Sequence, residues 1–275
     1  MRQIYPEPAD LGPDGLAARY AYPDLSGASP DDRPRWWLRA NMVTSLDGAA
    51  TVSGRSGGLS GGADQDVFAL LRVLADVIIV GAGTARTERY GPVRPGEEGV
   101  QWAWLRDGRP AAPPIAVVTR QLSLDPASPL LAGTGAARTI VITTESAPAG
   151  LRASVARTAE VIVAGQDSVD LPAAVAALAG HGYQRMLTEG GPGLLAQLIG
   201  ADLVDELCLT ISPLLAGPGA GRIVTGAGPL PGGARPVTLG HVLAQEGHLL
   251  CRYTPGAGLT AAGGELPPAK PEDRL

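Results

Sequence analysis

The sequence predicts an α/β fold with a mostly parallel central sheet, flanked by helices and completed by an antiparallel hairpin at its C-terminal end. Short runs of apolar and β-branched residues recur along the chain and are bounded by Gly, Pro or Asp. These runs are apolar on both faces, as is typical of strands in a parallel sheet that helices cover on both sides. Segments with helical periodicity alternate with the runs, which favours parallel crossover connections.

Seven runs are expected to form strands ahead of the hairpin: 38–45, 77–80, 115–119, 139–143, 160–164, 185–188 and 205–211. Three helices are expected between or after them. The first spans 64–75, where four aliphatic residues from Val67 to Leu74 share one face. The second is capped by Asp170 and carries Pro172 in its first turn, and the third begins near Pro192. The final hairpin turns at Glu246-Gly247.

The pattern divides the chain into one domain with two extensions. Residues 1–34 are rich in Pro, Asp and Gly, so they are expected to form an extended arm with one short helix near 16–19. Residues 35–254 hold the strands and helices, and the Gly/Ala/Pro stretch 255–275 is expected to be disordered. Trp36 and Trp37 are expected to be exposed, where they would pack the arm or an interface.

Composition excludes several classes of function. The formal net charge is −5 and the chain has a single Phe, which argues against a nucleic-acid partner. No apolar run resembles a signal peptide or a membrane span, so a cytoplasmic protein is expected. Cys208 and Cys251 fit buried apolar positions. The three histidines lack metal-ligand spacing, which predicts no metal site, and His241 and His248 are expected at the surface.

Two glycine turns, each directly after a predicted buried strand, carry the strongest chemical signal. The first contains Gly81, Gly83 and Thr84, and the second is Glu189-Gly190-Gly191-Pro192-Gly193 at a helix start. Glycine lets a backbone approach a phosphate, and a helix N-terminus offers unpaired N–H groups. Two such turns at one edge of a sheet suit a dinucleotide. The first turn alone equally fits a tight strand-to-helix connection, and the second could be a plain helix cap with Glu189 in solvent.

Two further positions follow predicted strands. Thr119-Arg120 could hold the 2′-phosphate of NADPH, since a guanidinium suits phosphate, although a surface arginine fits equally well. Asp47, in the Ser45-Leu46-Asp47-Gly48 turn, could orient a substrate or donate a proton, or simply form a turn.

Five segments in order make a family resemblance: NMVTSLDG, a helix ending ALLR, ADVIIVGAGT, TEGGPGLLAQL and DELCLTISPLLAG. Over residues 36–254 the chain resembles the C-terminal reductase domain of riboflavin-biosynthesis proteins, and within that family the stand-alone actinobacterial members. The resemblance implies a dihydrofolate-reductase-like fold, a homodimer, NADPH as hydride donor, and reduction of 5-amino-6-(5-phosphoribosylamino)uracil to the ribitylamino product.

The resemblance also implies roles for particular residues. Cofactor contacts are expected at Val43, Gly81, Gly83, Thr84, Thr119, Arg120, Gly190, Gly191, Pro192, Gly193 and Leu194. By the resemblance, substrate contacts are expected at Ser56 and Arg72, and Glu189 and Asp47 are expected to be catalytic. Asn41 is added because it shares a strand face with Val43, and Arg94 as a substitute outside the family's register.

The chain also departs from the family. Ala49 and Ala50 stand where a basic residue usually follows SLDG, and Gly58 stands where the family has a Trp against the cofactor. The family's Ala-Asp-Asp-Pro-x-Leu-Thr-x-Arg segment, which helps hold the substrate phosphate, becomes residues 87–94 here, with Arg89 or Arg94 as possible substitutes. Two alternatives therefore stay open: a dihydrofolate-type reductase acting on a pterin, and a non-catalytic protein that binds NADPH.

Overall fold

The computed structural model describes residues 1–26, 35–94, 99–132, 137–226 and 228–256. The strands are β1 (Arg2–Tyr5), β2 (Ala9–Asp10), β3 (Trp37–Ser45), β4 (Val77–Gly81), β5 (Ile115–Val118), β6 (Ile140–Thr143), β7 (Glu160–Val163), β8 (Arg185–Thr188), β9 (Glu206–Ser212), β10 (Val237–Gln245) and β11 (His248–Pro255). The α-helices are α1 (Pro13–Arg19), α2 (Gly62–Leu74), α3 (Ala82–Thr87), α4 (Pro129–Ala132), α5 (Ala149–Val155), α6 (Leu171–Gly180) and α7 (Pro192–Gly200). Two 3₁₀ turns, η1 (Ser56–Gly58) and η2 (Val100–Arg106), complete the elements.

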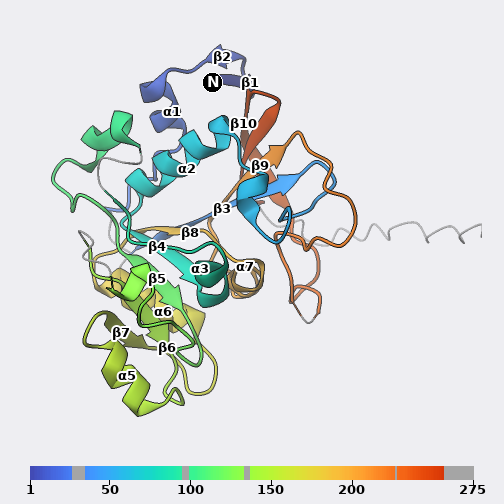
Figure 1. The fold of residues 1–275 in the computed structure, drawn as a ribbon. Helices are drawn as coiled ribbons and strands as arrows, with labels where there is room; N and C mark the ends of the chain where they lie inside the picture. The colour runs from blue at the N-terminus through green and yellow to red at the C-terminus, as the bar shows by residue number, and fades with distance from the viewer. Residues whose placement is uncertain (27–34, 95–98, 133–136, 227, 257–275) are drawn as a thin grey trace, which may run out of the picture.

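All strands join one sheet in the order β2-β1-β10-β11-β9-β3-β8-β4-β5-β6-β7 (Figure 1). The seven strands from β9 to β7 pair in parallel, and β11, β10, β1 and β2 add antiparallel neighbours at the β9 edge. The mostly parallel sheet and the C-terminal hairpin predicted from the sequence are therefore confirmed. β3 lies between β8 and β9, both of which come much later in the chain.

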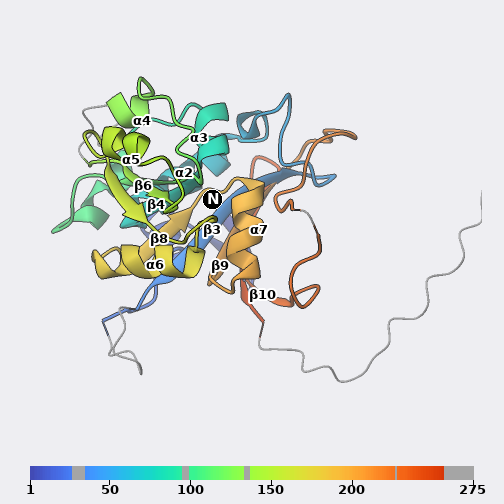
Figure 2. The same cartoon turned by 90° about the horizontal axis from the view of Figure 1, so that it is seen from below.

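Alternating side chains of the parallel strands feed two separate cores, one on each face of the sheet. Ile78 and Val80 of β4 join the cluster beneath α2 and α3, whereas Val77 and Ile79 join the cluster beneath α6 and α7. Figure 2 shows α6 and α7 on the side of the sheet away from α2 and α3. This two-sided burial explains why the strand segments read as continuous apolar runs. Asp170 caps α6 as expected, its carboxylate accepting from the Ala173 amide at 2.9 Å.

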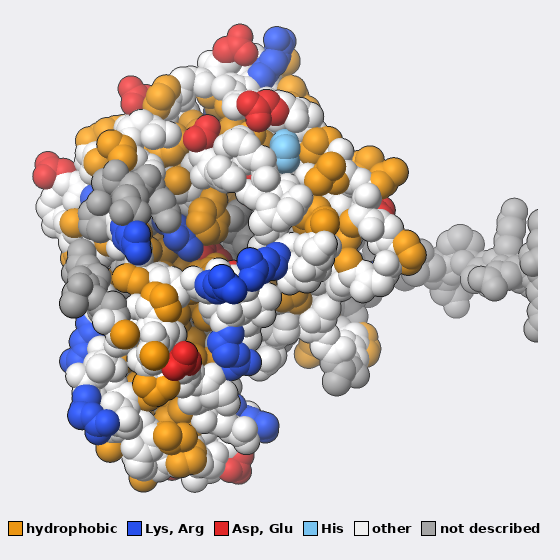
Figure 3. Space-filling model, viewed as in Figure 1, with side chains coloured by type: hydrophobic (Ala, Val, Ile, Leu, Met, Phe, Trp, Pro, Cys, Tyr) orange, Lys and Arg blue, Asp and Glu red, His pale blue; other side chains and the backbone are white. Residues whose placement is uncertain are grey.

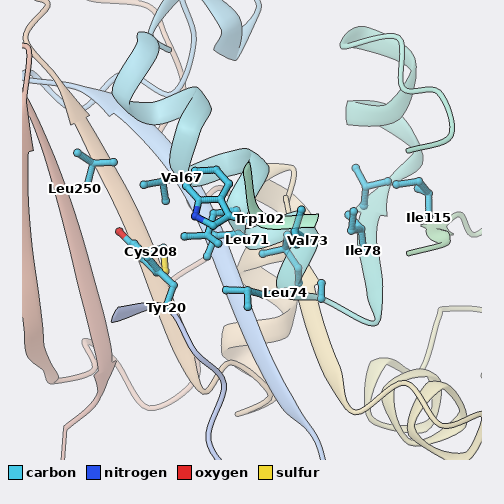
Figure 4. Close-up of a cluster of buried hydrophobic side chains, with 14 of the residues drawn as sticks. Tyr20, Val67, Leu71, Val73, Leu74, Ile78, Trp102, Ile115, Cys208 and Leu250 are labelled. Carbon is cyan, nitrogen blue, oxygen red and sulfur yellow. The ribbon is translucent and has the colours of Figure 1, made fainter. Parts of the chain in front are cut away.

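Helix α2 is held at its C-terminal end by η2. Trp102 of η2 is 2% exposed and packs near Val67 and Leu71 of α2 (Figure 4). The guanidinium groups of Arg106 and Arg109 donate to the carbonyl oxygens of residues 73–75 at 2.8–3.1 Å. These are the carbonyls that a helix leaves without intrahelical partners. Because α2 carries Arg72, this cap also fixes one wall of the site described below.

The N-terminal residues belong to the sheet and the core. β1 pairs antiparallel with β10, and α1 places Leu16 in the core beneath α2. The sequence suggested only the short helix, because a four-residue strand among Pro and Asp has too weak a pattern to stand out. Residues 27–34 of the expected arm and residues 257–275 of the expected tail lie outside the described residues.

Four surface assignments from the sequence were wrong. His241 and His248 are 3% and 7% exposed, because the hairpin lies between β9 and β1 and against α2. Trp36 is half-buried against the α6–α7 core, and the half-buried Trp37 donates its indole N–H to Glu206 at 3.1 Å. Cys208 and Cys251 are buried free thiols, as predicted.

An ion pair joins β3 to β9 inside the sheet. Arg39 Nε lies 2.6 Å from Glu206 Oε1, and both side chains have no exposed area. Arg252 of β11 donates to the other oxygen of Glu206 at 2.9 Å. The Arg39 guanidinium also stacks 4.2 Å from the Tyr22 ring centre. The N-terminal segment and three strands thus meet around one buried carboxylate.

Removing that carboxylate is expected to destabilise the folded protein strongly. Glu206→Leu should lower the free energy of unfolding by about 3–5 kcal/mol, because Arg39 stays buried without its counter-charge. Arg39→Met added to Glu206→Leu should recover part of the loss, since a buried pair can be replaced by apolar groups at little cost. Urea unfolding followed by circular dichroism measures both. Glu160→Leu, which breaks the exposed pair with His181, is the control and should cost about 1 kcal/mol or less. Equal losses in Glu206→Leu and the control would contradict the expectation.

Stability should also depend on pH through His241. Burial, and next the charge of Arg252, lower the pKa of this imidazole from 6.5 to about 4. The unfolded chain therefore takes up the proton first as the pH falls, so stability is complete above about pH 6.5 and declines towards pH 4. The loss attributable to His241 is at most about 3 kcal/mol. Urea unfolding of wild type and His241→Phe at pH 7 and pH 5 tests this, and an equal pH dependence in both proteins would contradict it.

Candidate functional site

The site is a cavity of about 950 Å³ at the carboxyl ends of β4 and β8, beside the second half of β3. Its walls come from β3, η1, α2, the β4–α3 turn, residues 87–94 and the β8–α7 turn. Figure 3 shows basic side chains around a hollow on this face. Ligands of open α/β sheets gather at this edge.

Most residues singled out from the sequence meet here. The lining includes Asn41, Val43, Ser56, Arg72, Gly81, Gly83, Thr84, Arg94, Glu189, Gly191, Pro192, Gly193 and Leu194. Asp47, Gly190, Thr119 and Arg120 are not among the lining residues. The six wall segments named above are spread over more than 150 residues of sequence, and the parallel crossover connections bring them together.

The two glycine turns pack directly on each other. The Gly81 amide donates to the Gly190 carbonyl at 2.8 Å, and the peptide bond between Gly190 and Gly191 is cis. A Cβ on Gly191 would lie 2.2 Å from Thr84 Oγ1, so a side chain there would displace the Thr84 hydroxyl. Gly190 is not among the lining residues, and its φ of +85° favours glycine. The turns therefore form a single backbone surface.

Three side chains form a hydrogen-bonded group at the inner end of the cavity. Arg72 binds Glu189 through two parallel bonds, from Nε to Oε1 at 2.7 Å and from Nη2 to Oε2 at 2.8 Å. The Tyr90 hydroxyl donates to Glu189 Oε2 at 2.6 Å. The Phe68 ring lies against the guanidinium, whose carbon is 4.1 Å from the ring centre. Burial, and next the Glu189 charge, raise the pKa of Tyr90 well above its ordinary value. Tyr90 therefore remains a hydrogen-bond donor at physiological pH.

A second carboxylate of the cavity lining is less buried than Glu189. Glu88, at the end of α3, accepts from the backbone amide and the hydroxyl of Ser56, at 2.8 and 3.0 Å. Arg89, which follows it, also lines the cavity. Charged groups of both signs thus lie side by side on this wall.

The structure does not bring Asp47 into the cavity. Its carboxylate accepts from the Ser45 hydroxyl at 2.5 Å and from the amides of Ala216 and Gly217 at 3.0 and 2.8 Å. These bonds, the Ser45 hydroxyl first, lower the pKa of Asp47 to about 2. The Gly48 amide donates to the Ser45 carbonyl at 3.1 Å, so the segment forms the turn that the sequence left open. Asp47 also joins this turn to the loop after β9, which the sequence did not predict.

Thr119 and Arg120 lie one strand further from the cavity. They follow β5, the neighbour of β4, at the same edge of the sheet. Thr119 is buried, and the Arg120 carbonyl accepts from the hydroxyls of Thr143 and Thr144. The Arg120 side chain is exposed.

Sequence reasoning missed several lining residues, including Phe68, Glu88 and Tyr90. Phe68 is the single Phe of the chain and lies four residues before Arg72, a helical spacing that could have paired them. Glu88 and Tyr90 fall in the segment where the chain departs from its family, so no motif marked them.

Within the described part of the chain, no cluster of three His, Cys, Asp or Glu side chains could hold a metal ion. Nor does any helix there have the length and apolar character to cross a bilayer.

Comparison with known proteins gives consistent matches. The model of the RibD C-terminal domain family matches residues 36–245. A protein of Methanothermobacter thermautotrophicus named 2,5-diamino-6-ribosylamino-4(3H)-pyrimidinone 5′-phosphate reductase is 31% identical over 183 residues, which cover 66% of this chain and 80% of that protein. A protein of the same name from Archaeoglobus fulgidus is 29% identical, over 66% of this chain and 83% of its own length.

A solved structure agrees with the sequence matches. A pyrimidine reductase-like protein from Corynebacterium diphtheriae superposes with a TM-score of 0.70 and 27% identity, covering 85% of this chain and 98% of its own. The family match spans β3 to β10, which include every wall of the cavity. This chain belongs to the RibD C-terminal domain family, the reductases of riboflavin biosynthesis.

Proposed function

We propose that this protein is an NADPH-dependent reductase that converts the ribosyl group of a phosphoribosylamino pyrimidine into a ribityl chain. The observation that carries the proposal is the Arg72–Glu189–Tyr90 group, held within the same cavity as the two glycine turns. The sequence motifs favour 5-amino-6-(5-phosphoribosylamino)uracil as substrate. The archaeal relatives are named for the 2,5-diamino pyrimidinone, which carries an amino group in place of the uracil 2-oxygen. The family resemblance also suggests a homodimer.

The glycine turns fit the phosphates of a dinucleotide. A helix leaves its first amide groups without intrahelical partners, and α7 has no side-chain cap at Gly191. A Cβ built on Gly193 would meet no atom within 4 Å, so a ligand can approach the backbone there. Thr84 Oγ1 adds a hydroxyl beside this turn. NADPH bound here would supply the hydride. The exposed Arg120, one strand further out, would favour a 2′-phosphate.

The Arg72–Glu189–Tyr90 group would position the substrate rather than transfer its proton. Both oxygens of Glu189 already accept charge-assisted or short hydrogen bonds, so the carboxylate is held in one orientation. Glu189 in turn fixes the plane of the Arg72 guanidinium, with Phe68 behind it. A fixed guanidinium can orient the polar substituents of a pyrimidine or its ribosyl hydroxyls. Alignment of C1′ with the hydride would supply most of the rate enhancement.

The experiment that tests this function is NADPH oxidation at 340 nm with purified protein. The two phosphoribosylamino pyrimidines and dihydrofolate are offered separately, and each is repeated with NADH. We expect oxidation with at least one pyrimidine, a preference for NADPH, and none with dihydrofolate. Turnover of dihydrofolate alone would assign the site to pterins. Binding of NADPH without turnover of any substrate would leave a non-catalytic protein.

Variants of the three-residue group test the positioning role. Glu189→Ala should lower kcat/KM roughly 100-fold or more, because Arg72 loses its bidentate partner. Tyr90→Phe should cost roughly 10-fold, because one hydrogen bond to Glu189 is lost while the ring stays. Glu145→Ala, an exposed carboxylate beyond the cavity, is the control. Unchanged kcat/KM in Glu189→Ala would contradict the role, and thermal midpoints show whether each variant is folded.

A further inference from the structure

The wall formed by Ser56 and Glu88 is an anion-binding geometry that the protein fills with its own carboxylate. The Ser56 amide and hydroxyl converge on a single oxygen, Glu88 Oε1, at 2.8 and 3.0 Å. Two donors that converge on one charged oxygen form a strong hydrogen-bonding site, and they suit a phosphate oxygen as well as a carboxylate oxygen. Ser56 and Glu88 lie 32 residues apart in sequence and both line the cavity.

The formal charges of the cavity lining also indicate that Glu88 takes the place of an anionic ligand. Among the residues that the structure describes, the charged lining residues are three arginines, Arg72, Arg89 and Arg94, and three acids, Asp64, Glu88 and Glu189. Their formal charges cancel. Arg72 is committed to Glu189, and Asp64 accepts from the Ser60 hydroxyl. Glu88 directly precedes Arg89 in the chain, so it brings a negative charge to the same stretch of the wall. Without the charge of Glu88, these described lining residues would carry a net formal charge of +1.

We propose that Glu88 sets the charge specificity of the cavity, because its carboxylate competes with the phosphate of a sugar-phosphate substrate for the Ser56 donors. This inference rests on the proposed function only in taking the substrate to carry a phosphate. A phosphorylated ligand must displace Glu88 from Ser56 and approach a like charge, which weakens its binding. A ligand without phosphate meets neither obstacle. Glu88 thus reduces the difference in binding affinity between the phosphorylated substrate and its dephosphorylated form.

Direct binding tests the proposal without requiring turnover. The full-length protein is titrated calorimetrically with ribose 5-phosphate, and with ribose as the uncharged match, in saturating NADP⁺ to block sites for coenzyme phosphates. Glu88→Gln keeps an acceptor for Ser56 but removes the charge, and Glu88→Ala removes both. We expect both variants to bind ribose 5-phosphate roughly tenfold more tightly than wild type, with ribose binding unchanged. Glu145→Gln removes an equal charge beyond the cavity and should bind as wild type does.

Kinetics gives a second readout. The ratio of kcat/KM for the phosphorylated pyrimidine to that for its dephosphorylated form should rise roughly tenfold in Glu88→Gln. Equal or weaker ribose 5-phosphate binding in both Glu88 variants would overturn the proposal, as would an equal gain in Glu145→Gln. If no pyrimidine is reduced by any protein, the proposed function fails. A selective gain in ribose 5-phosphate binding would then still support the role of Glu88.

Discussion

The buried pair of Arg39 and Glu206 is the constraint on which the arrangement of this molecule depends. It links β3 to β9, the two strands at which the parallel part of the sheet meets the antiparallel part. Two charges without exposed area tolerate few alternative positions, because a shift of register would leave each charge without its partner in a medium of low dielectric constant. The same carboxylate holds Arg252 of β11 and Trp37 of β3. The pair therefore fixes where β3 lies, and β3 carries Asn41 and Val43 to the cavity.

In the cavity, too, carboxylates are held by fixed hydrogen-bond donors, although they are less completely buried than Glu206. Glu189 is matched by Arg72 and Glu88 by the Ser56 donors, so the site holds its polar groups in place before a ligand arrives. The two carboxylates differ in what holds them. Glu189 accepts two bonds from a guanidinium and one from a tyrosine, whereas the bonds to Glu88 come from a neutral amide and a hydroxyl. A charged ligand can therefore replace Glu88 at its donors much more readily than it can replace Glu189.

The parallel strands and most of the cavity residues could be predicted from the sequence, because both leave local patterns in it. Burial on two faces produces continuous apolar runs, and a close backbone approach requires glycines such as Gly191. What it could not predict depends on contacts between distant segments. β1 is recognisable only through its pairing with β10, and the burial of His241 only through the strands on either side of it. Asp47 was misplaced for the same reason, since two of its hydrogen-bond donors, the amides of Ala216 and Gly217, lie about 170 residues away. Glu88 and Tyr90 lie in a segment without a family motif.

Because β1 pairs with β10, the part of the chain that folds together is longer than the part that the family model matches. The family match begins at residue 36, yet Leu16 and Tyr20 are buried in the core under α2, and the Tyr22 hydroxyl donates to the Met186 carbonyl of β8. The match ends at residue 245, before β11, the strand that connects the hairpin to β9. A fragment cut at the family boundaries would expose the ring-stacked face of Arg39 and leave β9 as an open edge. The unit that folds around this cavity thus extends beyond the residues that the family model matches at both ends.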